Sequence, residues 1–432
     1  MAEATSTPPA SGLVARFKQV LHGLGTDLLM IMLGVVAVRG YAPHAEWLTF
    51  MLAITVMMAM AATSSWRRGF RLGFWFGVGH YGWGFYWLIN SLHGHGGLPL
   101  PGALAMLLGL AAIIGLYTGL FGALLGRMGP GSVWFLLGGP SLWAFAEWLR
   151  SWVFSGFPWN LAGYVWDGQL QILQVAELVG VYGLSWLAIW GPAVAVWWWF
   201  QPSDVRINRL LWAGPLVVVP LVMVHLYGGV RIVTLDALPK EPGEPLRVAL
   251  VQPNIPQHEK WDRKLRQQNL DIHFKLSEAI KGPVDLLVWP ETALTFFYHR
   301  EFPFLMRFNR LLQKMNTTAT VGAPVVMPAQ EGDKKYFNSL LVFDKGNMVP
   351  SRRYDKHHLV PFGEYLPFRG IIPDSITKFT QGSSDFSTGP GPQVMSFAKG
   401  ALGPLICYEA IFPGEVAALG RQGAKWLLNV TN

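Results

Sequence analysis

Long apolar runs with few charged residues between them dominate the chain up to about residue 230. A membrane-spanning helix needs roughly 20 mostly apolar residues, and several segments reach or approach that length. These segments are residues 24–42, 46–64, 70–91, 102–126, 131–149, 174–200 and 209–229. The pattern predicts a transmembrane domain of about seven helices over residues 24–230, preceded by an N-terminal tail of residues 1–23.

From residue 244 onward the apolar residues take the spacing of a soluble protein. Short apolar stretches predict strands, and amphipathic stretches predict helices. The predicted strands are 246–251, 285–290, 320–326, 404–408 and 425–430, with a hairpin of 339–343 and 348–353; the predicted helices are 262–281, 302–315 and 413–421. Alternating strands and helices are typical of a mostly parallel sheet covered by helices. We therefore expect a second domain over residues 244–432.

Lysine and arginine in the short loops indicate how the membrane domain is oriented, because basic loops stay on the cytoplasmic side. With a cytoplasmic N-terminal tail, the outer loops carry only Arg39 and Arg150. The inner segments carry Arg16, Lys18, Arg67, Arg68, Arg71, Arg127, Arg206 and Arg209. An odd number of spans then places the second domain on the outer side.

The composition supports a membrane protein and argues against other classes. Hydrophobic residues make up 51% of the chain and charged residues 14%, which is a membrane-protein profile. The net charge of +8 is spread along the chain rather than gathered in a basic stripe, so we expect no nucleic acid partner.

His93 and His95 share a loop without a third ligand nearby, so we expect no metal. Residues 77–82 match the dinucleotide-binding pattern inside a predicted span, which we interpret as helix packing.

Three reactive side chains stand at predicted strand ends in the second domain: Glu291, Lys356 and the single cysteine, Cys407. Ligands of such sheets collect outside the carboxyl ends of the strands. A thiol with a pKa of about 8.5 is mostly protonated at neutral pH and needs a nearby base or cation to react. Glu291 could accept the proton, and Lys356 could stabilise first the thiolate and then an oxyanion.

Each of these residues also has an ordinary structural explanation. Glu291 could cap the following segment, Lys356 could be a surface charge, and Cys407 could be a core residue. A histidine base is the alternative, since His357 and His358 follow Lys356 directly. On an extended segment neighbouring side chains point to opposite sides, so Lys356 and His357 cannot both face one site.

The strings around these residues resemble the nitrilase superfamily, whose members use a Glu, Lys, Cys triad. The strings are residues 252–255 (QPNI), 289–293 (WPETA), 354–365 (YDKHHLVPFGEY) and 405–409 (LICYE). Together with residues 156–159 (GFPW) and the predicted spans, they resemble the membrane branch of that superfamily, the apolipoprotein N-acyltransferases. The resemblance covers nearly the whole chain.

The resemblance implies a multi-pass α-helical membrane domain joined to an α/β nitrilase-like domain, an αββα sandwich. It implies a ping-pong reaction in which Cys407, the nucleophile, takes an acyl chain from a phospholipid, typically phosphatidylethanolamine, as a thioester. The chain then passes to the α-amino group of the diacylglyceryl-cysteine of an apolipoprotein. Glu291 would be the base and Lys356 the oxyanion stabiliser.

The resemblance also implies supporting roles for Glu364, Tyr408 and Glu409, and binding of the second substrate by Trp261. It places the protein in the bacterial cytoplasmic (inner) membrane, among membrane lipids, with its catalytic domain in the periplasm. We expect a monomer that needs no cofactor and no metal. Family members continue beyond residues 429–432 (NVTN) with more of the sandwich and a further span, so we expect a chain truncated at its C-terminus.

Two other functions stay open. One is a membrane-tethered amidase or nitrilase-type hydrolase, although seven spans exceed what a tether needs. The other is a non-catalytic membrane sensor or transporter, against which the few ionisable residues within the spans argue. Residues 362–387, rich in Gly, Pro and Ser, are a candidate lid, with an ordinary surface loop as the other interpretation.

Overall fold

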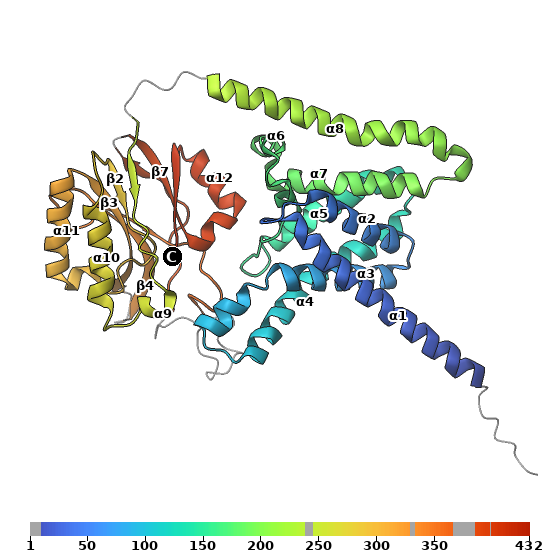
Figure 1. Ribbon diagram of the computed structural model, residues 1–432, viewed down its shortest axis with the longest axis horizontal. Coiled ribbons are helices and arrows are strands. Elements are labelled where there is room, and N and C mark those ends of the chain that lie inside the picture. Colours follow the sequence, from blue (N-terminus) through green and yellow to red (C-terminus); the bar gives the residue numbers. More distant parts are fainter. Residues whose placement is uncertain (1–9, 238–244, 329–332, 366–384, 398) are drawn as a thin grey trace, which may run out of the picture. The chain divides into compact units, whose positions relative to one another are not determined.

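The computed structural model describes residues 10–237, 245–328, 333–365, 385–397 and 399–432 (Figure 1). The chain divides into two compact units, which we call the helical unit and the sandwich unit. The helical unit comprises Met1–Ile89 and Pro99–Pro239, and the sandwich unit comprises Asn90–Leu98 and Lys240–Asn432. Most of the candidate lid, residues 366–384, lies outside the described residues.

Long helices make up the helical unit, and each predicted span coincides with one of them. These helices are α1 (Ala10–Ala37), α2 (Trp47–Ala62), α3 (Trp66–Gly84), α4 (Leu100–Met128), α5 (Val133–Arg150), α7 (Ala176–Trp199) and α8 (Ser203–Ala237), with the short α6 (Leu170–Leu173) before α7. The apolar runs therefore predicted the helices well, although their ends differ by several residues.

Within the described residues, four helical segments are long and apolar enough to cross a membrane. They are Gly23–Gly40, Leu100–Met128, Ala176–Trp199 and Leu210–Ala237. Helix α2 is apolar but has only 16 residues, and α3 begins with several arginines. The expected number of about seven crossings therefore stays a prediction.

Close helix packing explains the glycine-rich string in α3. A Cβ added to Gly73 would lie 2.1 Å from the carbonyl oxygen of Thr118 in α4, and one added to Gly77 would lie 2.0 Å from the Thr118 hydroxyl oxygen. Only glycine permits such an approach between helices. The string resembling a dinucleotide-binding motif is thus helical and packed, as expected.

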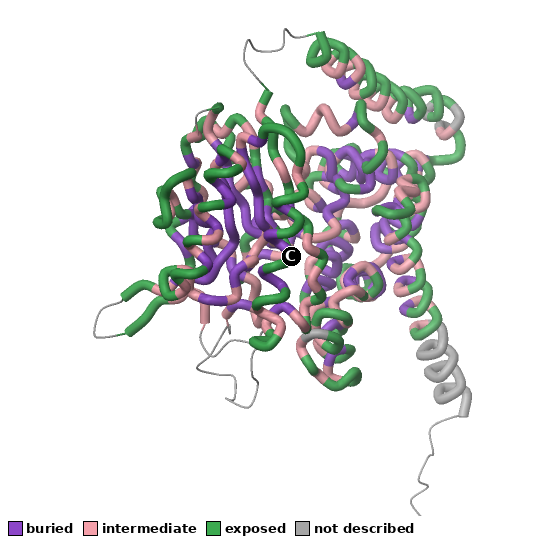
Figure 2. Tube along the Cα trace, turned by 60° about the vertical axis from the view of Figure 1, so that its left-hand side comes forward, coloured by how far each residue is buried: buried purple, intermediate pink, exposed green. Residues whose placement is uncertain are grey.

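Helix α8 differs from the others in how little of it the protein covers. Only 6% of its apolar window, Leu210–Ala237, is buried, and its trace is mostly green in Figure 2. A helix that is apolar around most of its surface needs either a protein interior or a lipid environment. The exposure of α8 therefore fits contact with lipid.

The sandwich unit contains two sheets. The first has the strand order β1 (Val248–Leu250), β2 (Leu286–Val288), β3 (Thr318–Pro328), β4 (Lys334–Phe343), β5 (Arg352–Asp355); the second has the order β6 (Met395–Phe397), β7 (Gly400–Ile406), β8 (Trp426–Val430). Strands β1, β2 and β3 pair in parallel, as do β7 and β8. Strands β3, β4 and β5 pair antiparallel, as do β6 and β7.

The expectation of a mostly parallel sheet was therefore wrong. Strands β3, β4 and β5 follow one another through connections too short for a crossover helix, and such connections join antiparallel neighbours. The second sheet receives β6, a strand of three residues that the apolar pattern did not reveal.

Helices enclose the two sheets, in the order helix, sheet, sheet, helix. The helices are α9 (Gln257–Lys260), α10 (Arg266–Glu278), α11 (Phe302–Met315) and α12 (Pro413–Arg421). Leu287 of β2 packs with Phe274 of α10 and Phe308 of α11. The neighbouring Leu286 packs with Ile406 of the second sheet, because successive strand residues point to opposite faces. Figure 1 shows α12 on the far side of the second sheet, which confirms the αββα fold.

Candidate active site

Each of the three predicted catalytic residues follows the end of a strand. Strand β2 ends at Val288, shortly before Glu291, and β5 ends at Asp355, directly before Lys356. Strand β7 of the second sheet ends directly before Cys407. All three residues thus follow the carboxyl end of a strand, where ligand sites of α/β proteins form.

Lys356 lies between two carboxylates. Its Nζ is 2.9 Å from Oε2 of Glu364 and 3.7 Å from Oε1 of Glu291, and the residue is only 1% exposed. Asn338 of β4 donates a hydrogen bond of 2.9 Å from Nδ2 to Oε1 of each carboxylate. The structure therefore brings Glu291, Lys356 and Glu364 together, with an asparagine that the sequence analysis did not identify.

Cys407 occupies a strained turn. The predicted strand 404–408 instead ends at Ile406, and Cys407–Ile411 form a 3-10 helix. At the end of the strand, Oε2 of Glu409 accepts a hydrogen bond of 2.7 Å from the Ile406 amide. Cys407 itself has φ 53°, a left-handed conformation that costs a residue other than glycine about 1–3 kcal/mol. Such strain is typical of functional positions.

The electrostatics of the site favour a neutral thiol beside a fixed cation. Burial and the carboxylate of Glu291 raise the pKa of the Cys407 thiol, and Lys356 opposes them only in part. Burial alone would lower the pKa of Lys356, but Glu364, Glu291 and Cys407 together raise it above its ordinary value. Lys356 therefore stays charged, and the sulfur needs a base to take its proton during attack.

Glu409 links two of the strand ends. It is completely buried, and its Oε1 accepts hydrogen bonds from the Tyr354 hydroxyl at 2.8 Å and the His357 amide at 2.7 Å. Its Oε2 holds the Ile406 amide. Because the segment after β5 carries Lys356 and the segment after β7 carries Cys407, this one carboxylate fixes both. Burial nevertheless raises the pKa of Glu409 despite these donors.

The other predicted site residues are Tyr408 and Trp261. Tyr408 is buried, and its ring forms a T-shaped pair with that of Phe412 at a centroid distance of 5.0 Å. Trp261 is partly exposed and follows the end of α9. The structure places Tyr408 directly after the nucleophile candidate and leaves part of Trp261 accessible.

The two neighbouring histidines have partners elsewhere. Nδ1 of His357 lies 3.0 Å from the Gly389 carbonyl oxygen, and Nδ1 of His358 lies 2.7 Å from Oε1 of Glu415. Glu291, Lys356 and Glu364 are the ionisable groups with the largest effects on the pKa of Cys407. This arrangement favours Glu291 over a histidine as the base.

The turn that carries Glu291 is crowded. A Cβ added to Gly322 of β3 would lie 2.4 Å from the Pro290 carbonyl oxygen and 2.5 Å from the Thr292 amide nitrogen. Thr292 has φ 42°, which is unusual for a β-branched residue. Glycine at position 322 is therefore required for the turn to lie against β3. Sequence reasoning missed this, because the contact joins segments far apart along the chain.

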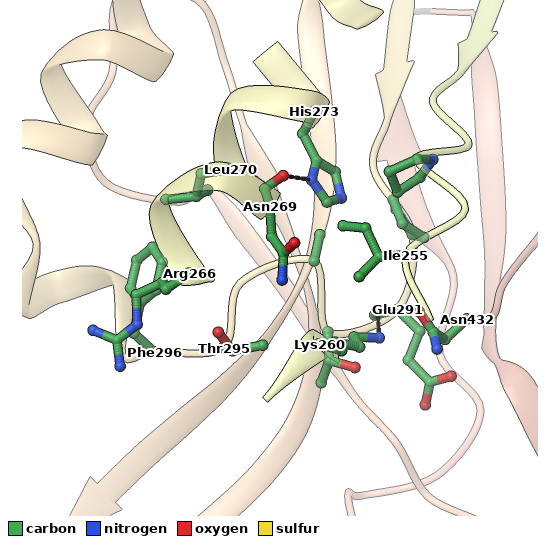
Figure 3. Close-up of a pocket in the computed structure, with 14 residues that line it drawn as sticks. Ile255, Lys260, Arg266, Asn269, Leu270, His273, Glu291, Thr295, Phe296 and Asn432 are labelled. Atoms are coloured by element: carbon green, nitrogen blue, oxygen red, sulfur yellow. Dashed lines mark hydrogen bonds between the residues drawn. The ribbon is translucent and has the colours of Figure 1, made fainter. Parts of the chain in front are cut away.

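Sequence reasoning also missed Lys260, a buried lysine at the end of α9. Its Nζ donates a hydrogen bond of 2.8 Å to the main-chain oxygen of Glu291 (Figure 3). Its place directly before the predicted substrate residue Trp261 was the available signal. Within the residues that the structure describes, no group of three or more His, Cys, Asp or Glu could hold a metal ion.

Fold and site together define a carbon–nitrogen hydrolase domain joined to membrane helices. A family model described as carbon-nitrogen hydrolase matches residues 247–432. A second, described as apolipoprotein N-acyltransferase N-terminal domain, matches residues 33–194.

Curated relatives called apolipoprotein N-acyltransferase extend this match over most of the chain, and three of them serve as examples. The relative from Geobacter metallireducens is 33% identical over 374 residues, 85% of this chain and 69% of the relative. That from Photobacterium profundum is 30% identical over 427 residues, 96% of this chain and 78% of the relative. The relative from Rhodopseudomonas palustris is 31% identical over 454 residues, which cover 98% of this chain and 80% of the relative.

The chain belongs to the apolipoprotein N-acyltransferase family. It is therefore a membrane protein and an acyltransferase, and the resemblance read from the sequence is confirmed.

Proposed function

We propose that this protein moves a fatty acyl chain from a phospholipid, through a thioester on Cys407, to the α-amino group of the diacylglyceryl-cysteine of an apolipoprotein. One observation carries the proposal. The buried Lys356 lies between the carboxylates of Glu291 and Glu364, and both Glu291 and Lys356 act on the pKa of the single cysteine. Membership of the acyltransferase family supports a phospholipid as the acyl donor and an apolipoprotein as the acceptor.

In the first half-reaction Glu291 takes the thiol proton as the Cys407 sulfur attacks the ester carbonyl carbon of the phospholipid. A carbon–sulfur bond forms, and Lys356 stabilises the oxyanion of the tetrahedral intermediate. The intermediate collapses by breaking the ester carbon–oxygen bond. The leaving lysophospholipid alkoxide takes the proton from Glu291, so the base is ready for the next step.

In the second half-reaction the α-amino group of the acceptor attacks the thioester carbon. Glu291 accepts the proton that the amine loses, and Lys356 again stabilises the oxyanion. The carbon–sulfur bond breaks as the amide forms, and the proton held by Glu291 returns to the sulfur. No oxidant, cofactor or metal is needed in either step.

The remaining predicted residues have supporting roles in this proposal. Glu364 holds Lys356 by accepting its hydrogen bond and by an ion pair, and Glu409 fixes the segments that carry Lys356 and Cys407. Trp261, which is partly exposed, binds the second substrate. Tyr408 shapes the turn that follows the nucleophile.

The proposed setting is the bacterial cytoplasmic (inner) membrane. The distribution of basic residues among the loops supports a cytoplasmic N-terminus and a periplasmic sandwich unit. The proposal includes a helical domain over residues 24–230 and a catalytic domain over residues 244–432. The proposed donor is phosphatidylethanolamine, and the proposed active form is a monomer.

The test is incubation of the purified protein with phosphatidylethanolamine alone. We expect an acyl mass on the peptide that contains Cys407, which hydroxylamine removes because it cleaves thioesters. Mass spectrometry of the digested protein gives the site, and Cys407→Ala serves as the control. An unmodified thiol in the intact protein, or transfer to a lipopeptide by Cys407→Ala at the normal rate, would contradict the proposal.

Hydrolysis of an amide is the second candidate, because the sandwich unit matches carbon–nitrogen hydrolases. The same three residues would then pass the acyl group to water instead of an amine. Release of free acid from simple amides, without transfer to a diacylglyceryl lipopeptide, would favour this candidate.

A further inference from the structure

Lys260 is a buried lysine with an unusual set of contacts. It is only 5% exposed, and its Nζ donates to the main-chain oxygen of Glu291 at 2.8 Å. Figure 3 shows its ammonium directed at the main chain of Glu291, whose carboxylate extends away from that bond. Among the described residues, Lys260 has no ion pair with a carboxylate. Its position near the candidate base is therefore not explained by an ordinary salt bridge.

Keeping an ammonium in this position is costly. An ion removed from water loses hydration, which one hydrogen bond to a carbonyl group does not fully replace. Accordingly, burial lowers the pKa of Lys260 to about 8, although Glu291 and Cys407 act in the opposite direction. A methionine or leucine would fill the same space without that cost. The cost indicates that the charge or the donor contributes to the site.

A fixed hydrogen-bond donor to the main-chain carbonyl of Glu291 would help to hold the turn at this residue. Thr292, the next residue, has φ 42°, and Gly322 presses against the turn from β3. A strained turn keeps its conformation only when its surroundings hold it. The ammonium of Lys260 holds the carbonyl group at the centre of this turn, and so determines where the Glu291 side chain begins.

The charges of the neighbouring side chains also support a role for Lys260. The carboxylates of Glu291 and Glu364 flank Lys356, which leaves one negative charge in excess among these three groups. Lys260 is the second buried cation that interacts with Glu291 and with Cys407. With it, the site holds two positive and two negative charges. Without it, a net negative charge would oppose ionisation of the thiol.

We propose that Lys260 is a positioning residue for acyl transfer. It holds the main-chain carbonyl of Glu291, and it supplies the second positive charge that balances the two carboxylates around Lys356. This inference rests on the proposed function of the same site. It assigns no contact between Lys260 and the substrate.

The test uses the full chain with the substitutions Lys260→Met and Lys260→Arg. The matched control is Lys264→Met, at an exposed lysine four positions further along. The measured quantities are the maximal rate of Cys407 acylation by phosphatidylethanolamine, the lipid concentration that gives half that rate, and the temperature of thermal unfolding. Because the chain has one cysteine, acylation reports on a single residue.

We expect Lys260→Met to lower the maximal rate about 10- to 100-fold, the range for a misplaced catalytic group. The half-saturating lipid concentration should change by less than about twofold, since the lysine does not bind substrate. Lys260→Arg, which keeps a charged donor, should be at least about tenfold faster than Lys260→Met. Lys264→Met should behave as the wild type does.

Several outcomes would overturn this inference. They are a wild-type maximal rate in folded Lys260→Met, a change confined to the half-saturating concentration, or an arginine variant no faster than the methionine variant. If Lys260→Met lacks a cooperative unfolding transition, Lys260→Gln replaces it as the uncharged variant. Equal maximal rates of Cys407 acylation in Lys260→Gln and Lys260→Arg would then overturn the inference. A wild-type protein that forms no thioester refutes the proposed function instead, so the two failures are distinguishable.

Discussion

The raised pKa of the Cys407 thiol favours a protonated sulfur at rest, and this determines what the residues around it have to do. Burial and Glu291 raise its pKa, while Lys356 counteracts them only partly. If the sulfur were a thiolate at rest, a nearby cation would be enough to stabilise it. A protonated thiol instead needs a base that removes its proton as the sulfur attacks the substrate. In the proposed mechanism that base is Glu291, and its coupling to Lys356 through Asn338 and Glu364 holds it in a fixed position.

The thiol titration follows from these interactions. We expect the thiolate absorbance of the wild-type protein to reach half its maximum above pH 8.5 or so, the ordinary value for cysteine. Glu291→Gln should move the midpoint to lower pH, because it removes a negative charge that raises the pKa. Lys356→Met should move it to higher pH, because it removes the charge that lowers the pKa.

Lys264→Met, at an exposed site, is the control for this titration and should leave the midpoint unchanged. A wild-type midpoint below the ordinary value would mean a resting thiolate. Shifts of the opposite sign in the two variants would mean that Cys407 does not lie in the field of Glu291 and Lys356.

Among the secondary structure elements, helices were easier to predict than strand pairing. Helices α11 and α12 have the bounds that the apolar pattern predicted, Phe302–Met315 and Pro413–Arg421. The pattern did not reveal that the strands form two sheets, or that β7 ends at Ile406. Helical periodicity is a local property, whereas the end of β7 depends on the side chain of Glu409 and on pairing with β8.

The packing of β3 against the Glu291 turn gives a prediction at this level. Gly322→Ala would place a Cβ within 2.4 Å of the Pro290 carbonyl oxygen, so the turn must move. We expect the maximal rate of Cys407 acylation to fall at least about tenfold, since small displacements of a catalytic group are costly. The rate is measured by mass spectrometry of the thioester over time.

Gly420→Ala is the matched control, because a Cβ there meets no atom within 4 Å and the residue lies in α12. It should acylate Cys407 at the wild-type rate. Normal acylation in a folded Gly322→Ala protein would show that the turn tolerates displacement, and that the position of Glu291 is less restricted than we infer.

For the molecule as a whole, the charge distribution predicts how the helices are oriented in the membrane. With the N-terminal tail in the cytoplasm, nearly all loop arginines and lysines of the helical unit lie on the cytoplasmic side. Helix α8, the last before the sandwich unit, exposes apolar residues along most of its length. A final crossing by α8 would carry the sandwich unit to the periplasm.

Single cysteines in a Cys407→Ser background test this orientation. Lys264→Cys in the sandwich unit should react with a membrane-impermeant maleimide in spheroplasts. Ser65→Cys and Ser203→Cys, at exposed positions before α3 and at the start of α8, should react only after permeabilisation. Equal labelling of all three in intact spheroplasts, or the reverse pattern, would contradict the proposed topology.

The candidate chemistry was readable along the chain, since Glu291 and Cys407 follow short apolar stretches that form strands, and Lys356 directly follows the polar strand Arg352–Asp355. Hydrophobic periodicity and side-chain type are properties of neighbouring residues, so they predicted the helices and the three candidate residues. The αββα class was implied only by the resemblance to the nitrilase superfamily. The contacts that complete the site join residues tens of positions apart. Asn338 joins Glu291 to Glu364, Gly322 supports the turn, and Lys260 holds its carbonyl. These contacts exist because the sheets bring distant segments to one edge, which no local pattern encodes.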